Sequence, residues 1–295
     1  MPPRFPSPTR LIRFLTAWLL LAALAASPAA AQGLVIRFFN VGQADAALIT
    51  SPEGKTALID GGDNNGNASY ELHLLSVDSL DLIIASHNHA DHIGGLTDII
   101  RTSTVGAYMD NGVPMTTATY NNLSLMLKAR NVRYLEATPR TIQLGSVSLR
   151  ILPRPPGDKS QNNNSVGVLL TYGSFTALFT GDAEGKEREY WRANAMLPHV
   201  AVLKLSHHGA LNGTDTTWLA TTRPRVAVIS VGANNKYGHP SRTTLRSLAA
   251  VGAQVYRTDR DGDITVAVDS LGAFTIQTSE PGPVRTWPAV PASHH

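Results

Sequence analysis

The sequence contains no cysteine among its 295 residues. This absence excludes disulfide bonds and thiolate metal ligands together, and it excludes a lipoprotein because there is no cysteine to acylate. Charged residues are also scarce, since they make up 16% of the chain against 43% for hydrophobic residues. This balance is typical of a globular protein that buries a sizeable core and not of a disordered chain.

The apolar run near the N-terminus, residues 14–26, is too short to cross a bilayer comfortably. Three arginines precede it, and an Ala-rich A-x-A cleavage site ends at Ala31. This pattern predicts a signal peptide over residues 1–31 and a mature protein that begins near Gln32. We therefore expect an exported protein, periplasmic or extracellular, without stable membrane association after cleavage. An uncleaved membrane anchor is the alternative.

The predicted leader also changes the charge of the protein. The whole chain has a formal net charge of +3 and a pI of about 9.2. The leader holds three of the 25 basic residues and none of the 22 acidic ones, so 22 of each sign remain after cleavage. The bulk charge therefore does not predict nucleic-acid binding, and any phosphate-binding surface must be a local patch.

The rest of the chain divides into a predicted domain, 32–280, and a Pro-rich tail, 281–295, that we expect to be disordered. His294 and His295 belong to this tail and are not expected to bind metal. Strands and helices are interspersed, which favours two sheets packed face to face with helices outside. We expect strands at 34–39, 46–50, 55–59, 80–85 and 105–109, a β-rich stretch over 132–179, and further strands at 199–205, 225–231, 254–257, 263–268 and 273–277. We expect helices at 70–77, 93–100, 120–129, 184–195, 214–221 and 241–251.

The most informative segment is His-Asn-His-Ala-Asp-His over residues 87–92, directly after the apolar strand expected at 80–85. Imidazole nitrogens and carboxylate oxygens are the ligands that a borderline cation such as zinc selects. Four such groups at one strand end would be costly to bury without a metal or a dense hydrogen-bond network. The segment therefore predicts a metal site, and the alternative is a solvated, histidine-rich loop.

This segment resembles the His-x-His-x-Asp-His signature of the metallo-β-lactamase superfamily. Other motifs occur in the order found in the hydrolase domain of ComEC-type DNA-uptake proteins, and the resemblance spans about residues 34–278. It implies an α/β fold of the αββα sandwich type, with two mixed β-sheets packed face to face and helices outside. The motifs are Phe-Asn-Val-Gly-Gln-Ala-Asp-Ala (39–46), Lys-Thr-Ala-Leu-Ile-Asp-Gly-Gly (55–62), Asn-Asn-Asn-Ser (162–165), Phe-Thr-Gly-Asp-Ala-Glu (179–184), Leu-Ser-His-His-Gly (205–209) and Tyr-Gly-His-Pro (237–240).

The candidate metal ligands lie where expected strands end, the usual place for a site built on a rigid sheet. His87 and His89 are two residues apart in an extended segment, so both can face one metal ion. Asp91 and His92 follow one turn later and can reach a second position. Asp91 is also a candidate catalytic residue.

Three further candidates come from the second half of the chain. Asp182 follows an expected strand and is placed as a carboxylate that bridges two cations. His207 or His208 would complete the second site, but their spacing does not distinguish them; the other would support a ligand or contact substrate. We therefore expect one or two divalent ions, zinc or manganese.

Supporting roles are expected for three other residues. By the resemblance, Asp60 holds a ligand histidine, which fixes the tautomer and orients the ring. Asp45 has a similar role or caps a turn. His239 is the second candidate catalytic residue, for substrate contact or for proton donation to the leaving group, unless it is a structural turn histidine.

The sequence departs from the superfamily pattern in one important place. Many members supply a further histidine ligand before the bridging aspartate, but this chain has no histidine between His92 and His199. The corresponding region holds Asn163 and Asn164, which we consider as possible substrate contacts or weak metal ligands. An amide oxygen suits manganese better than zinc, so metal identity is open. A smaller departure is Ala44, where relatives usually have glycine.

The residues themselves indicate a metal-dependent hydrolase that uses hydroxide at neutral pH. The resemblance adds the substrate class, phosphodiesters and possibly DNA, and thus a phosphodiesterase or nuclease linked to competence. The alternative is a hydrolase of small lactones, β-lactams or choline-phosphate esters. A non-catalytic binding protein with this fold is the third possibility, and the full ligand set argues against it. The oligomeric state is not predicted.

Overall fold

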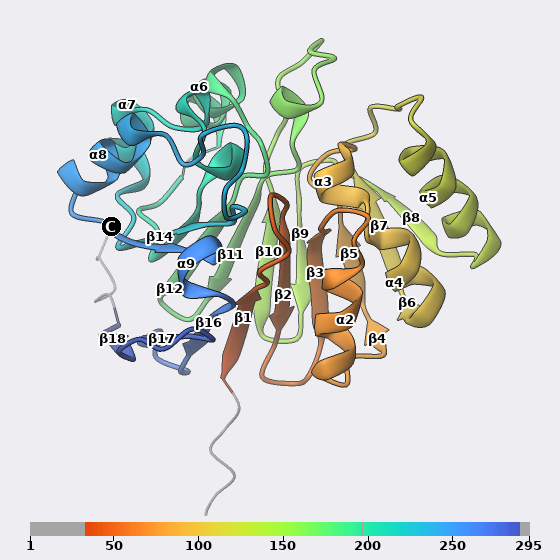
Figure 1. The fold of residues 1–295 in the computed structure, drawn as a ribbon, viewed down its shortest axis with the longest axis horizontal. Helices are drawn as coiled ribbons and strands as arrows, with labels where there is room; N and C mark the ends of the chain where they lie inside the picture. Colours follow the sequence, from red (N-terminus) through yellow and green to blue (C-terminus); the bar gives the residue numbers. More distant parts are fainter. Residues whose placement is uncertain (1–32, 196, 290–295) are drawn as a thin grey trace, which may run out of the picture. The chain divides into compact units, whose positions relative to one another are not determined.

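Two β-sheets pack face to face in the part of the chain that the structure, a computed structural model, describes: residues 33–195 and 197–289. Figure 1 shows helices on the outer side of each sheet. This is the αββα sandwich that the sequence predicts, and the predicted fold class is confirmed. The predicted signal peptide, 1–31, lies outside the described residues.

The first sheet has nine strands in the order β18-β17-β16-β1-β2-β3-β5-β7-β8. Buried and less buried residues alternate in β1, where Leu34, Ile36 and Phe38 face the core between the sheets, whereas β3, β5 and β7 are buried throughout. The strands are β1 (Leu34–Phe38), β2 (Ala46–Thr50), β3 (Thr56–Gly61), β5 (Leu82–Ile84), β7 (Ala107–Asp110), β8 (Arg133–Glu136), β16 (Ile264–Val268), β17 (Phe274–Thr278) and β18 (Arg285–Trp287).

The second sheet has seven strands in the order β15-β14-β13-β12-β11-β10-β9. Phe179 on β12 stacks on Phe38 of the first sheet with ring centroids 5.7 Å apart, which joins the two sheets in one core. A small additional sheet pairs β4 (Ser79–Leu80) with β6 (Thr104–Val105). The seven strands are β9 (Arg140–Leu144), β10 (Val147–Ile151), β11 (Val168–Tyr172), β12 (Phe175–Phe179), β13 (Val202–Lys204), β14 (Val226–Ile229) and β15 (Gln254–Arg257).

The helices bury one side each against a sheet. Helices α2 to α5 pack on the nine-stranded sheet and helices α6 to α8 on the seven-stranded sheet (Figure 1). None of the described helices is long and apolar enough to cross a membrane. They are α2 (Asn67–Leu74), α3 (Ala90–Ile93), α4 (Leu96–Thr102), α5 (Ala118–Ala129), α6 (Gly185–Asn194), α7 (Thr216–Thr222), α8 (Arg242–Ala250) and α9 (Thr258–Asp261), with 3-10 turns η2 (Asn162–Asn164), η3 (Ser206–Gly209) and η4 (Leu211–Gly213).

The C-terminal tail differs from its prediction. Strand β18 lies inside the segment 281–295 that we expected to be disordered, and it pairs with β17. Trp287 stacks on Phe274 with ring centroids 5.0 Å apart, and this apolar contact explains why three residues of the Pro-rich segment join the sheet. His294 and His295 lie outside the described residues.

Parallel pairing brings the candidate site residues to one edge of the sandwich. Strands β3 and β5 run parallel in one sheet, and β12, β13 and β14 run parallel in the other. Parallel strands end at the same edge of their sheet, so the segments that follow them lie together. Asp60 and the loops at 86–92, 180–184, 206–209 and 230–239 all come from these strand ends.

Candidate metal centre

The segment 87–92 is held in place by a buried network of amide groups. Asn88, which separates His87 from His89, donates its side-chain N–H groups to Asn111 Oδ1 and to the carbonyl of Val113. Its backbone N–H donates to Gln161 Oε1 at 3.0 Å. These bonds fix the backbone between the two histidines, and α3 then turns Asp91 and His92 toward the same region.

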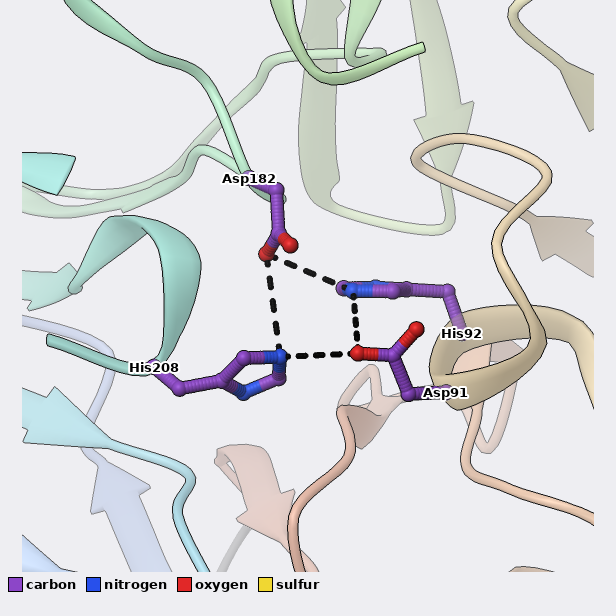
Figure 2. A group of neighbouring side chains, drawn as sticks. All are labelled: Asp91, His92, Asp182 and His208. Carbon is purple, nitrogen blue, oxygen red and sulfur yellow. Dashed lines mark hydrogen bonds and ion pairs between the residues drawn. The ribbon is translucent and has the colours of Figure 1, made fainter. Parts of the chain in front are cut away.

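Four ligand candidates from three parts of the chain form one compact group. Figure 2 shows the side chains of Asp91, His92, Asp182 and His208 converging, and their ligand atoms all lie within 4.8 Å of one another. Asp182 Oδ1 lies 3.3 Å from His92 Nε2 and 3.9 Å from His208 Nε2. Asp91 Oδ2 lies 3.1 Å from His208 Nε2. Two carboxylates and two imidazoles in this arrangement suit a divalent cation.

The other oxygen of Asp182 faces a second group. His87 Nε2 lies 3.9 Å from Asp182 Oδ2, and His207 Nε2 lies 3.7 Å from the same oxygen. His89 belongs to the same group, because its Nδ1 lies 2.9 Å from His87 Nε2. The structure therefore distinguishes the two adjacent histidines, which their spacing could not: His208 lies near Asp182 Oδ1 and His207 near Asp182 Oδ2.

Asp60 holds His92, as the resemblance implies. Its Oδ2 accepts from His92 Nδ1 at 2.9 Å, and its Oδ1 accepts from the backbone N–H of Ser86 at 2.6 Å. The Ser86 hydroxyl also lies within 3.2 Å of both Asp60 Oδ2 and His92 Nδ1. With Nδ1 occupied in this way, His92 presents Nε2 to Asp182 and Asp91. Ser86 gave no signal in the sequence beyond its place beside the motif.

Asp45 lies against the other buried histidine. Its Oδ1 is 3.3 Å from His208 Nδ1, which also lies 3.0 Å from the carbonyl oxygen of Ser230. Its Oδ2 forms a 2.7 Å ion pair with Lys204, whose side chain is 5% exposed. The sequence analysis missed Lys204, although a lysine inside the apolar run of β13 was an available signal, because a buried cation needs a partner.

The charges of this buried group are strongly coupled. Burial alone would raise the pKa of Asp182, but His92 and His208 hold it well below its ordinary value. Burial alone would lower the pKa of His208, yet Asp182 and Asp45 raise it to about 10. The pKa of His92 is raised well above its usual range by Asp182 and Asp60, which outweigh burial. Without a metal ion, protons on these imidazoles balance the carboxylates.

Three site residues have left-handed backbone conformations that are unusual for side chains other than glycine. The φ angles are 59° at Asp60 and 51° at both His207 and His208. Such conformations cost about 1–3 kcal/mol each, persist only where the surroundings enforce them, and cluster at functional sites. In η3 they direct two successive histidines to the two oxygens of Asp182.

The side-chain amides of the asparagine-rich loop bond to the loop itself and to α6. Asn163 Oδ1 accepts from the backbone N–H of Glu187, and Asn164 Nδ2 donates to two carbonyls of its own loop. Their role as substrate contacts or weak metal ligands stays a prediction. The same loop also positions Asp182, whose backbone N–H donates to the Ser165 hydroxyl at 3.2 Å.

His239 lies beside the two groups. Its ring centroid is 5.8 Å from that of His207 and 6.5 Å from that of His208. The ring is half-buried, and burial, assisted by the neighbouring histidines, lowers its pKa. On the other side of His207, Glu184 Oε1 lies 3.8 Å from His207 Nδ1 and accepts from two asparagine side chains. The sequence analysis gave Glu184 no role.

Comparison with known proteins agrees with this geometry. The family model described as the metallo-beta-lactamase superfamily matches residues 39–233. ComE operon protein 3 of Bacillus subtilis is 26% identical over 82% of this chain and 34% of that protein. Recombination protein 2 of Haemophilus influenzae is 28% identical over 77% of this chain and 28% of that protein. The chain therefore spans about a third or less of the length of these curated relatives, and the predicted resemblance is confirmed.

Solved structures support the fold. A diphosphatase from the PhnP family superposes with a TM-score of 0.53 at 16% identity, covering 80% of this chain and 98% of that one. The metallo-beta-lactamase fold protein YhfI from Bacillus subtilis gives a TM-score of 0.52 at 12% identity, covering 76% of this chain and 96% of that one. At this identity the likeness extends to the fold and not to the substrate.

Proposed function

Because the chain belongs to the metallo-beta-lactamase superfamily, we propose that it is an exported metal-dependent hydrolase that cleaves phosphodiesters, with nucleic acid as substrate. The observation that carries this proposal is the carboxylate of Asp182, whose two oxygens face two separate groups of ligand candidates. A carboxylate in this position suits two neighbouring cations, and paired cations are well suited to in-line displacement at phosphorus.

The buried side chains fit a cation. His92 Nε2 and Asp182 Oδ1 are 3.3 Å apart, and neither makes a hydrogen bond within residues 33–195 and 197–289. Buried polar atoms left in this state are costly unless a metal ion or water satisfies them. The residues that would hold one cation are Asp91, His92 and His208, and those that would hold the other are His87, His89 and His207, with Asp182 serving both.

The chain's own residues orient these ligands and handle protons. When bound, divalent cations lower the pKa of a water molecule and stabilise negative charge on a departing oxygen. Asp60 and Asp45 fix the rings of His92 and His208. His239 contacts the leaving oxygen as a hydrogen-bond donor, and a hydrogen bond to a charged group typically contributes about 1.5–3 kcal/mol.

The choice of nucleic acid rests on the relatives. One of them, recombination protein 2 of Haemophilus influenzae, is named for recombination, a process that acts on DNA. Because the region after the leader has no net charge, phosphate contacts must be local. Lys236, on the loop that carries His239, supplies positive charge beside the site, with its amine 5.3 Å from the centroid of the Tyr237 ring.

Export rests on the pattern of residues 1–31, with cleavage before Gln32. N-terminal sequencing of the protein recovered from its native cell tests this part separately. An N-terminus at Gln32 in the periplasmic or extracellular fraction supports export, whereas an intact Met1 in the membrane fraction would contradict cleavage.

The substrate is tested with the mature protein loaded with zinc or with manganese. The panel contains bis-p-nitrophenyl phosphate, single- and double-stranded DNA, a lactone, a choline-phosphate ester and a cephalosporin. Asp182→Asn serves as the inactive variant, and Asp110→Asn is its matched control, because Asp110 is a buried carboxylate that bonds Tyr134 and lies outside the ligand groups.

The proposal expects turnover of bis-p-nitrophenyl phosphate and DNA that Asp182→Asn abolishes and Asp110→Asn retains. Turnover of the lactone, the choline-phosphate ester or the cephalosporin alone would replace phosphodiesters with a small-molecule substrate. Bound metal without turnover of any substrate would leave a binding protein with this fold.

A further inference from the structure

We propose that Gln43 fixes the tautomer of His239, so that the ring proton of the neutral imidazole lies on Nε2. Gln43 is then a positioning residue, which acts only through His239. The use of that N–H as a hydrogen-bond donor to a leaving oxygen rests on the proposed function, but the tautomer itself follows from the contacts of Gln43.

The side-chain amide of Gln43 has one orientation. The backbone N–H of Gly232 donates to Gln43 Oε1 at 3.1 Å, and a backbone N–H can face only an acceptor. The amide nitrogen of Gln43 therefore occupies the other position, 3.4 Å from His239 Nδ1. An amide nitrogen donates and does not accept, so His239 Nδ1 has to be the acceptor. In a neutral imidazole the proton then lies on Nε2.

Close contact between two loops makes this arrangement rigid. A Cβ atom built on Gly232 would lie 2.7 Å from the backbone nitrogen of Gln43 and 3.1 Å from its Cβ. The first distance is shorter than real Cβ atoms show and the second is tight, so a side chain at 232 would push the two loops apart. Gly232→Ala would therefore displace Gln43 while leaving its amide intact.

The loop that carries His239 is closed on itself. Asn235 Oδ1 accepts from the backbone N–H of His239, and Asn235 Nδ2 donates to the carbonyls of His239 and Gly232. The ring of Tyr237 stacks on the His239 ring with centroids 5.6 Å apart. These contacts hold the backbone of His239 and one face of its ring, so the ring has a fixed position relative to Gln43.

The tautomer is measured by NMR on zinc-loaded protein with ¹⁵N-labelled histidine, and the His239 signals are assigned by their loss in His239→Gln. In the wild-type protein we expect an unprotonated Nδ1 and a protonated Nε2. Gln43→Leu and Gly232→Ala should each give a mixture of tautomers. Gln43→Glu keeps an acceptor for Gly232 but offers His239 Nδ1 a carboxylate, so it should move the proton to Nδ1. Gln143→Leu, an exposed substitution on β9, is the control and should change nothing.

Rates provide a second readout. Gln43→Leu should lower turnover of a phosphodiester with a poor leaving group by about 2- to 10-fold, the effect of one hydrogen bond, at unchanged metal content. It should hardly affect p-nitrophenyl esters, because p-nitrophenolate delocalises its negative charge and needs little stabilisation from a hydrogen bond. A protonated Nδ1 in the wild type, or the same tautomer in all variants, would overturn the inference even if phosphodiesterase activity is found. Absence of that activity together with the expected tautomers would overturn only the proposed function.

Discussion

The two groups of ligands around Asp182 differ in how firmly the chain holds them. The group at Oδ1 contains a second carboxylate, Asp91, and its histidines are almost fully buried. Each of those histidines has its other ring nitrogen against a carboxylate, His92 against Asp60 and His208 against Asp45. We call Asp91, His92 and His208 the braced group.

The group at Oδ2 is built differently. It contains three histidines, His87, His89 and His207, which we call the histidine group. His87 Nδ1 lies 3.1 Å from the Ser86 hydroxyl, and Glu184 Oε1 is 3.8 Å from His207 Nδ1, farther than Asp60 is from His92 or Asp45 from His208. Because partners that orient a ligand and extra negative charge both strengthen metal binding, we infer that the braced group binds metal more tightly than the histidine group.

The largest expected effect comes from Asp182→Ala, which should remove the difference between the groups altogether. The residue serves both groups, so metal content should fall in both and hydrolysis should be lost. Metal analysis and turnover of the purified variant are the measurements, with circular dichroism to show that it is folded. Near-wild-type turnover with metal still bound would remove Asp182 from the site.

The adjacent histidines allow a matched comparison. His208→Ala should abolish tight metal binding, because it removes a braced ligand. His207→Ala should keep one tightly bound ion per chain and lose only the weaker one. Competition with a chromophoric chelator measures both affinities. Equal losses in the two variants would show that the groups are not separate.

Asp60→Asn should weaken metal binding moderately. The amide can still contact His92 but no longer supplies the negative charge that raises its basicity, and loss of such a partner typically costs about 10–100-fold in affinity or activity. Asp110→Asn is the control for substitution of a buried carboxylate. An Asp60 variant with unchanged tight binding would mean that Asp60 only stabilises the fold.

The smallest effect concerns protons. In the metal-free protein the pKa of His208 is raised to about 10 by Asp182 and Asp45 against the effect of burial, so at pH 8 the ring carries a proton that a metal ion must displace. Metal affinity should therefore rise with pH until about pH 10, with about one proton released from this residue. Calorimetry in buffers of different ionisation enthalpy counts the protons. His208→Asn should release fewer, and the same number in both proteins would assign the proton elsewhere.

The sequence predicted which side chains lie close together better than it predicted how they are grouped. The order of strands and helices and the family resemblance predicted the fold class, and the position of the 87–92 pattern after an apolar strand predicted the place of the site, because strand ends meet at one edge. It could not separate His207 from His208, since their positive φ angles arise from tertiary contacts. It also could not show that Asn163 accepts a hydrogen bond from the backbone of Glu187, because that contact joins residues 24 positions apart.

A crystal structure of the mature protein soaked with manganese, with anomalous scattering recorded, tests the inequality of the two groups most directly. We predict a strong peak among Asp91, His92 and His208 and a weaker one beside His87, His89 and His207, with one oxygen of Asp182 toward each. A peak confined to the histidine group, or two peaks of equal occupancy at limiting metal, would contradict this account.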